Sequence, residues 1–454
     1  MGCTRNPLRI WGRFFVVVIF LLAALSPSAV WAAFASQFSL SVGEQYNDNI
    51  FFARKKEHDF VTIITPTLHL YYAPTGQAEP TLNLNISPSG EIYARHSELN
   101  SFGETASVNG DYTYHYSPRL RFNLSDTLRR QGQTRTQGVS DAFQPPLTPT
   151  TGAPGLPGPG QNLDDFVSRG DQLNNTLAFQ GRFLYRPDIT FNGGYTNRFV
   201  KFIDQGGTDL FHQFAIRGVY NWRQEHNLHV GYSVAFVDSR NGDNGVIHDF
   251  DFGDDYFTSQ VYKIELTPTL SLSASSGLSV NTSDSGPRIA NKSTVTITKL
   301  WETASLTGGL RKGLTPSFGI SGISDTTSLF SNFRIQLAER VSGIAGADYS
   351  FYDTDDVNFK TFRASAGLQY LITTWLSSNL TYSYRFINSG AGATNTDLLS
   401  RGNVNGNSVF LSITARFDLW PNTGLARNLS SSALSPVIMT PFPAVPAPTA
   451  PAKP

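Results

Sequence analysis

The chain has 454 residues, of which 15% are charged and 13% aromatic, and it contains 39 Gly, 25 Pro and one Cys. Its 35 Lys and Arg residues balance 35 Asp and Glu residues, which excludes a nucleic-acid-binding protein that relies on a basic face. The slightly polar mean hydropathy also excludes a bundle of transmembrane helices. A β-rich protein remains, either secreted or embedded in an outer membrane.

The first segment of the chain has the pattern of a secretory signal peptide. Three arginines precede an unbroken apolar run at residues 14–25, and small residues lead to Ala32. We expect cleavage after Ala32, so that residues 1–32 are removed. The alternative, an uncleaved membrane anchor, is disfavoured because the apolar run is short for a bilayer span. Cleavage also removes Cys3, the one cysteine, and leaves no thiol for a disulfide or a metal site.

From residue 37 onward the dominant pattern is an alternation of apolar and polar residues. Phe38, Leu40 and Val42 show it near the start, and Leu411 and Ile413 show it near the end. Successive side chains on a strand point to opposite faces, so each such segment predicts a strand with one apolar and one polar face. A soluble β-sandwich would give the same alternation.

The connections between these segments favour a membrane barrel, because they alternate between short and long. Short turns are expected at residues such as 117–119, 186–188 and 267–269. This sorting is typical of bacterial outer-membrane barrels, with short turns in the periplasm and long loops outside. We therefore predict an all-β fold at residues 33–420: an antiparallel transmembrane outer-membrane β-barrel of about 18 strands (16–18). The expected long extracellular loops are residues 47–58, 96–101, 132–174, 239–251, 283–291, 312–325, 353–358 and 388–405.

Aromatic residues cluster near the predicted strand ends, as in the interfacial girdle of a barrel in lipid. Aromatic packing in a soluble sheet is the alternative. The last strand ends in Trp420 and resembles the C-terminal signal by which barrel-assembly machinery recognises its clients. Residues 421–454 follow as a Pro-rich tail, which we expect to be disordered and periplasmic.

Two segments near the start of the barrel resemble a known family. They are SVGEQYNDNIF at residues 41–51 and DFVTIITP at residues 59–66. They are similar to the opening of a family of outer-membrane β-barrel porins often encoded beside exopolysaccharide synthesis and exosortase genes. The resemblance implies a role in exporting or retaining a surface polysaccharide. Expected partners are outer-membrane lipid and lipopolysaccharide, the assembly machinery, polysaccharide and periplasmic export components.

Arginine recurs on the polar register of the predicted strands. A basic lumen would lower the barrier for an anionic solute such as an acidic sugar polymer. The alternative is structural, with each arginine pairing with acids or carbonyls to stiffen the barrel. The same register has fewer predicted acids, namely Glu91, Asp111, Asp348 and Asp418. The candidate lumenal basic residues are Arg121, Arg129, Arg182, Arg198, Arg217, Arg311, Arg334, Arg363, Arg385 and Arg416.

Two loops are unusual in composition. Residues 132–174 are rich in Pro and Gly and predict a flexible external loop, with folding into the barrel mouth as the alternative. Residues 243–255 concentrate carboxylates, and we expect an external acidic loop that is solvated or bridged to lipopolysaccharide. A calcium site is the less favoured alternative, because the spacing fits no EF-hand.

The sequence therefore predicts an outer-membrane channel. The alternative is a structural or adhesive barrel that binds surface polymer without conducting it. We expect no enzyme, cofactor or metal site, because the histidines are scattered and no nucleophile motif or phosphate-binding loop is present.

Overall fold

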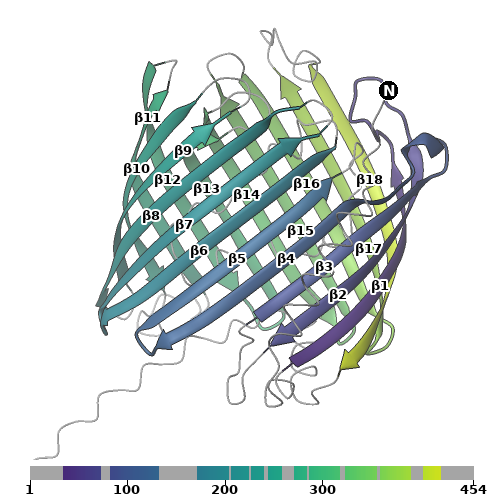
Figure 1. The fold of residues 1–454 in the computed structure, drawn as a ribbon, viewed down its shortest axis with the longest axis horizontal. Coiled ribbons are helices and arrows are strands. Elements are labelled where there is room, and N and C mark those ends of the chain that lie inside the picture. The colour runs from purple at the N-terminus through teal and green to yellow at the C-terminus, as the bar shows by residue number, and fades with distance from the viewer. Residues whose placement is uncertain are drawn as a thin grey trace, which may run out of the picture.

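The computed structural model describes residues 34–72, 82–131, 171–203, 206–223, 226–239, 244–257, 270–283, 286–316, 323–354, 358–389 and 402–420. These residues form one sheet of 18 strands that closes on itself (Figure 1). A short 3-10 helix, Ser97–Leu99, lies in a connection. No helix among these residues is long and apolar enough to cross a membrane.

The strands follow one another around the ring in chain order. They are β1 (Phe34–Asn47), β2 (Asp59–Tyr72), β3 (Leu82–Tyr93), β4 (Ser101–Ser117), β5 (Leu120–Gln131), β6 (Gln172–Arg186), β7 (Ile189–Phe202), β8 (Thr208–Arg223), β9 (His226–Asp238), β10 (Gly245–Phe257), β11 (Leu270–Ser283), β12 (Gly286–Leu300), β13 (Ala304–Pro316), β14 (Ile323–Ala338), β15 (Val341–Asp353), β16 (Asn358–Leu371), β17 (Leu376–Ser389) and β18 (Asn403–Trp420).

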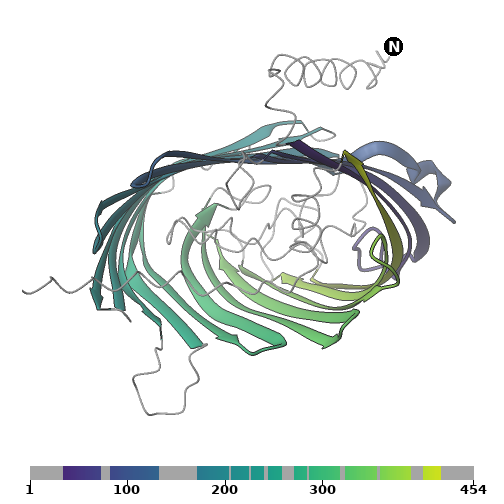
Figure 2. The ribbon, with the colours of Figure 1, turned by 90° about the horizontal axis from the view of Figure 1, so that it is seen from below.

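Each strand pairs in antiparallel fashion with its neighbours in the chain, and the ring closes where β1 pairs with β18. At this seam Leu40 lies opposite Ala415, and Val42 lies opposite Ile413. Figure 2 shows the strands as a closed, oval ring. Closure leaves no unpaired sheet edge. The predicted antiparallel barrel of about 18 strands is confirmed, and the soluble sandwich is excluded.

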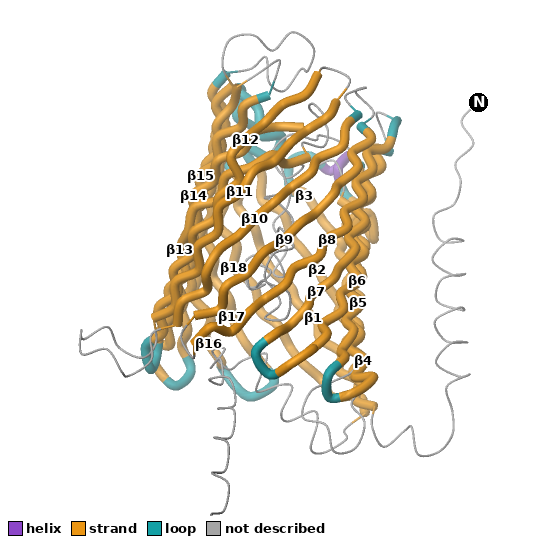
Figure 3. Tube along the Cα trace, turned by 90° about the vertical axis from the view of Figure 1, so that its left-hand side faces the viewer, coloured by secondary structure: helices purple, strands orange, loops and turns teal. Residues whose placement is uncertain are grey.

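Most connections at one rim of the barrel are shorter than those at the other. The exceptions are residues 73–81 and 258–269, which are long at the rim of the short turns, and residues 284–285, which are short at the opposite rim. At one rim, Ser117 is separated from Leu120, and Arg186 from Ile189, by tight turns (Figure 3). β1 begins and β18 ends at this same rim. The opposite rim carries longer connections, such as residues 48–58 and 94–100. Because bacterial barrels keep short turns and both termini in the periplasm, we assign the lower rim in Figure 1 to the periplasmic side.

Three of the predicted extracellular loops are wrong in their bounds. The sequence predicts loops over residues 239–251, 283–291 and 312–325, but β10 begins at Gly245, β12 begins at Gly286, β13 ends at Pro316 and β14 begins at Ile323. These segments carry charged or polar residues on one face of a strand, and this lowers their hydropathy to that of a loop. The predicted acidic loop at residues 243–255 is therefore mostly strand β10. The turn expected at residues 267–269 lies outside the described residues.

The outer face of the barrel is apolar. On β18, Leu411, Ile413 and Leu419 leave 51%, 51% and 55% of their surface exposed, whereas Ser412 between the first two is 1% exposed. Tyr116 lies just before a periplasmic turn and is also exposed. A continuous exposed apolar belt around a closed ring of strands is the surface that contacts lipid. The protein is therefore an outer-membrane barrel.

Several sequence predictions concern residues that the structure does not describe. These are the signal peptide at residues 1–32, the Pro-rich tail at residues 421–454, and residues 132–170 of the predicted loop at 132–174. They stay predictions.

Candidate functional site

Each strand has an outward row and a lumenal row of side chains, because neighbouring residues point to opposite faces. On β1, exposed Leu40 and Val42 belong to the outward row, and buried Ser39 and Ser41 belong to the lumenal row. Directly paired residues share a face, so the pairing carries this assignment around the ring. Arg217 on β8 contacts Asp251 on β10 across the intervening strand β9. The side chains of the two strands converge on the inner side of the curved wall, so this contact places both residues on the lumenal side.

The pairing places every arginine proposed from the sequence on the lumenal row, although their role in transport stays a prediction. Each is identified by the residue directly opposite it on a neighbouring strand. The pairs are Arg121 with Arg182, Arg129 with Asn174, Arg198 with Phe211, Arg217 with Gly231, Arg311 with Ser328, Arg334 with Ile344, Arg363 with Asp348, Arg385 with Gly406, and Arg416 with Ser39.

Two pairs of arginines face each other directly across neighbouring strands. Arg121 on β5 lies opposite Arg182 on β6, and Arg363 on β16 lies opposite Arg385 on β17. Like charges at directly opposed positions destabilise a sheet. Nε of Arg363 lies 2.9 Å from Oδ2 of Asp348, which offsets the repulsion in that pair. Both members of the Arg121–Arg182 pair are exposed within the barrel and concentrate positive charge near the periplasmic rim.

An acidic cluster on β10 was not among the predicted lumenal acids. Asp249, Asp251 and Asp255 lie on the lumenal row, opposite Ser233, Gly231 and Asn227 of β9. Nη2 of Arg217 lies 2.7 Å from Oδ2 of Asp251, and Nζ of Lys292 lies 3.2 Å from Oδ2 of Asp249 and 3.5 Å from Oδ1 of Asp251. Arg217 is thus paired with a carboxylate, as the structural alternative for the lumenal arginines expects.

His229 lies within this network on the lumenal row of β9. Its Nε2 is 3.9 Å from Asp251 and its Nδ1 is 3.7 Å from Asp255, and neither ring nitrogen makes a hydrogen bond among the described residues. Gly253 leaves the space for the ring, because a Cβ there would lie 2.7 Å from Nε2. The imidazole fills the wall between two carboxylates and is too buried to stack on a passing sugar ring.

Two tyrosines on the lumenal row, Tyr93 and Tyr352, are also buried wall residues. Tyr352 stacks on Phe359 with ring centroids 4.6 Å apart, and both side chains are almost fully buried. Tyr93 is equally buried and donates a hydrogen bond to Oε2 of Glu91 at 2.8 Å. His115 is exposed on the lumenal row beside Arg121, so it remains available to a solute.

An apolar cluster is packed near the extracellular rim. Its members come from strands on both sides of the acidic cluster, and most lie within a few residues of an extracellular strand end. Because these side chains are buried, the cluster stabilises the wall and is not a surface that a solute would contact. The cluster comprises Val200, Phe202, Phe211, Ala235, Val237, Ile247, Ala290, Leu314 and Ile323.

The YNDNI segment at residues 46–50 builds the first extracellular loop. The side chain of Asn49 is buried, donates to the carbonyls of Ala53 and Asn405 at 2.7 and 2.8 Å, and accepts from the Ala53 N–H at 2.8 Å. These bonds fold the loop back over the barrel wall. Phe52, with a φ of 45°, then lies 5.8 Å from the guanidinium of Arg385. The segment thus places an aromatic ring beside a lumenal arginine at the mouth.

The part of the chain that the structure describes contains no group of three or more His, Cys, Asp or Glu side chains that could hold a metal ion. The acidic cluster on β10 is occupied by Arg217 and Lys292 instead. The alternative of a calcium site at residues 243–255 requires these residues to form an external loop. Most of them form strand β10, so this requirement is not met.

Comparisons with known proteins give distant structural likenesses. No family model and no curated protein matches the chain. OpdQ of Pseudomonas aeruginosa is 11% identical over 87% of this chain and 100% of that chain, with a TM-score of 0.44. OccAB3 of Acinetobacter baumannii is 9% identical over 85% and 99%, with a TM-score of 0.43, and the outer membrane protein opdK of P. aeruginosa is 10% identical over 84% and 98%, with a TM-score of 0.40. Likenesses this distant assign no solute and no residue role, so the description of this chain as a porin-like outer-membrane barrel depends on its own geometry.

Proposed function

We propose that this barrel is an outer-membrane channel that favours anionic solutes. The observation that carries the proposal is the direct opposition of Arg121 and Arg182 on the lumenal row. Such a pair costs stability, and it is exposed inside the barrel where a solute would pass. An 18-stranded barrel is wide enough that side chains alone need not fill its interior, which allows an aqueous path.

The solute class that fits best is an acidic sugar polymer or one of its fragments. Lumenal arginines offer planar, permanently charged donors suited to carboxylates. The resemblance of residues 41–51 and 59–66 to exopolysaccharide-associated porins supports export or surface retention of such a polymer. Periplasmic export components and the polymer itself would then be partners. A barrel that binds the polymer without conducting it is the alternative outcome.

The first experiment measures conduction. The refolded barrel is inserted into planar lipid bilayers, and single-channel current is recorded in KCl. We expect stable, discrete conductance steps. If a correctly folded preparation gives no current but still binds acidic polysaccharide, the proposal of a channel is wrong and the adhesive barrel takes its place.

The second experiment measures charge selectivity from the reversal potential in a salt gradient. The double variant Arg121→Gln/Arg182→Gln removes two positive charges. The matched control, Arg217→Gln/Asp251→Asn, also alters two charged side chains but removes a neutral pair. If each charge in a wet lumen contributes roughly 0.5–1 kcal/mol, removing two charges lowers the anion-to-cation permeability ratio roughly five- to thirtyfold in the double variant only. Equal ratios in both variants would refute a role for the Arg121–Arg182 pair.

A further inference from the structure

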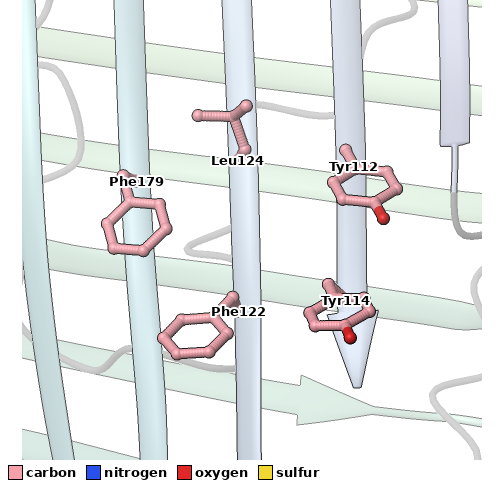
Figure 4. A pocket seen from close by; sticks show the side chains of 5 residues that line it. All are labelled: Tyr112, Tyr114, Phe122, Leu124 and Phe179. Carbon is pink, nitrogen blue, oxygen red and sulfur yellow. The ribbon is translucent and has the colours of Figure 1, made fainter. Parts of the chain in front are cut away.

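An aromatic groove lies on the outward row of β4, β5 and β6. Its lining residues are directly paired across the strands, Tyr112 with Leu124, Tyr114 with Phe122, and Leu124 with Phe179 (Figure 4). Tyr112 and Tyr114 stack with ring centroids 6.5 Å apart, and Phe122 and Phe179 stack with centroids 5.7 Å apart. The groove encloses about 340 Å³ and is open to the membrane side.

A glycine adjoins Phe122 at one side of this groove. Gly181 lies on the outward row directly opposite Phe122. A Cβ at Gly181 would lie 3.4 Å from the Phe122 ring, in ordinary contact. A larger side chain would therefore fit the backbone there but would lie over the ring and fill the groove. Residue 181 thus offers a way to close the groove without removing any of its aromatic side chains.

The groove lies at the depth of the periplasmic leaflet. Phe122 is three residues from Arg119 in the β4–β5 turn, which corresponds to about 10 Å of extended strand. The backbone carbonyl of Arg119 accepts the Leu184 N–H at 2.8 Å, so this turn adjoins the one that carries Arg186. Arg186 pairs with Asp188 at 3.2 Å, and its side chain remains 61% exposed. With exposed Arg119, the two turns carry a net positive charge at the level of lipid headgroups.

We propose that this groove binds one phospholipid of the periplasmic leaflet, with an acyl chain between the aromatic pairs and an anionic headgroup at Arg119 and Arg186. The apolar, aromatic walls suit a hydrocarbon chain. The basic turns suit a phosphate, because guanidinium groups bind phosphate oxygens through paired hydrogen bonds. The same combination does not suit a second barrel, whose own periplasmic turns would bring equal positive charge to the contact.

The test is native mass spectrometry of the folded, full-length barrel released from detergent, titrated with phosphatidylglycerol. Gly181→Leu fills the groove. Its matched control is Gly218→Leu, another outward glycine, whose added Cβ would lie 3.6 Å from the ring of Phe191. We expect one tightly retained phosphatidylglycerol in the parent and in Gly218→Leu. In Gly181→Leu its affinity falls about tenfold, the loss expected when roughly two methylene groups lose contact.

A second variant tests the headgroup part of the site. Arg119→Gln/Arg186→Gln keeps the groove, so we expect the lipid to be retained while the preference for phosphatidylglycerol over phosphatidylcholine is lost. Heat-modifiable migration on a gel verifies that each variant is folded. Equal lipid binding by Gly181→Leu and Gly218→Leu would overturn the proposal. A loss of dimer in place of a loss of lipid in Gly181→Leu would identify a second copy as the occupant and overturn it as well.

Discussion

At the extracellular rim, Asp48 and Asn407 join the first strand of the barrel to the last one. Oδ1 of Asp48 accepts the backbone N–H of Asn407 at 2.6 Å, and Oδ2 accepts the side-chain amide of Asn407 at 2.9 Å. Lys56 adds a contact to the same carboxylate at 2.8 Å. Asp48 belongs to the YNDNI segment, so this segment also fixes the first loop to the seam between β1 and β18.

Replacing Asp48 with Ala is expected to weaken this seam by about 1–3 kcal/mol, because the partly buried amides of Asn407 lose their acceptor. The control Lys56→Ala removes only a partly exposed ion pair and is expected to cost less than about 1 kcal/mol. The measurement is urea unfolding of the barrel in lipid vesicles. If both variants unfold at the same urea concentration, the Asp48–Asn407 contact does not stabilise the seam.

The contribution of Asp48 is also expected to depend on pH. Burial alone would raise the pKa of this carboxyl, but hydrogen bonds from Lys56 and Asn407 outweigh burial and lower the pKa below its usual value. A lowered folded-state pKa gives stability that is present above the ordinary carboxyl pKa and is lost as pH falls through the lowered value. The difference between the parent and Asp48→Ala therefore shrinks in strong acid. A difference that is the same at neutral and acid pH would contradict this assignment.

His96 makes the neighbouring extracellular connection sensitive to pH in the opposite direction. Its Nδ1 lies 2.8 Å from Oδ2 of Asp59, and its Nε2 lies 3.4 Å from Oε2 of Glu57. The hydrogen bond to Asp59, followed by the charges of Asp59 and the contact with Glu57, outweighs burial and raises the pKa of His96. The stabilisation is therefore complete below the ordinary histidine pKa and is lost as pH rises through the raised value.

NMR titration of the His96 imidazole checks this prediction. We expect a midpoint above the ordinary value of about 6.5, and a lower midpoint in Glu57→Gln. Glu98→Gln is the comparison variant. Glu98 raises the pKa of His96 only through its charge, so its removal is expected to lower the midpoint less than Glu57→Gln does. A midpoint at or below the ordinary value, or one unaffected by Glu57→Gln, would show that the carboxylates do not hold the protonated ring.

The assignment of rows on β11 can be tested with a pair of substitutions on one strand. Leu278 is outward and 55% exposed, whereas Ser275 is lumenal and lies opposite Gly253 of β10. An arginine on the lipid face near mid-membrane costs about 2–4 kcal/mol, so Leu278→Arg is expected to lower the free energy of unfolding by about that amount. Ser275→Arg enters the lumen near Asp251 and Asp255 and is expected to cost less than about 1 kcal/mol. The opposite order in vesicle unfolding would mean that the rows on β11 are reversed.

Most of the barrel is predictable from the sequence because alternation and turn spacing are local signals. Leu411 and Ile413 alternate with polar residues in the sequence, and they alternate between lipid and lumen in the structure. The same rule explains the error at β10. Phe250 and Phe252 alternate with Asp249 and Asp251 in register, but the acids suggested an external loop. The alternation of the two phenylalanines with the acids is the pattern that indicates the strand.

The pairing of lumenal charges is not predictable in the same way. Arg217 and Asp251 meet only because β8 and β10 flank β9 and Gly231 between them has no side chain, and this register depends on the whole ring. The sequence predicts the face of each arginine, but which arginine is neutralised depends on the pairing register of three successive strands, which alternation alone does not give. The contrast between Arg217, which pairs with Asp251, and Arg182, which lies opposite another arginine, is therefore a result of the fold.

The central claim is that the polar row of each strand encloses water while the apolar row meets lipid. Arg182 and Phe183 are adjacent in β6 and belong to opposite rows, since they pair with Asn192 and Phe191 of β7. Arg182→Cys and Phe183→Cys, each with Cys3→Ser, are recorded in planar bilayers while a charged, membrane-impermeant thiol reagent is added. We expect a stepwise fall in current for Arg182→Cys and none for Phe183→Cys. Reaction at Phe183→Cys with none at Arg182→Cys, or equal reaction at both, would contradict the claim.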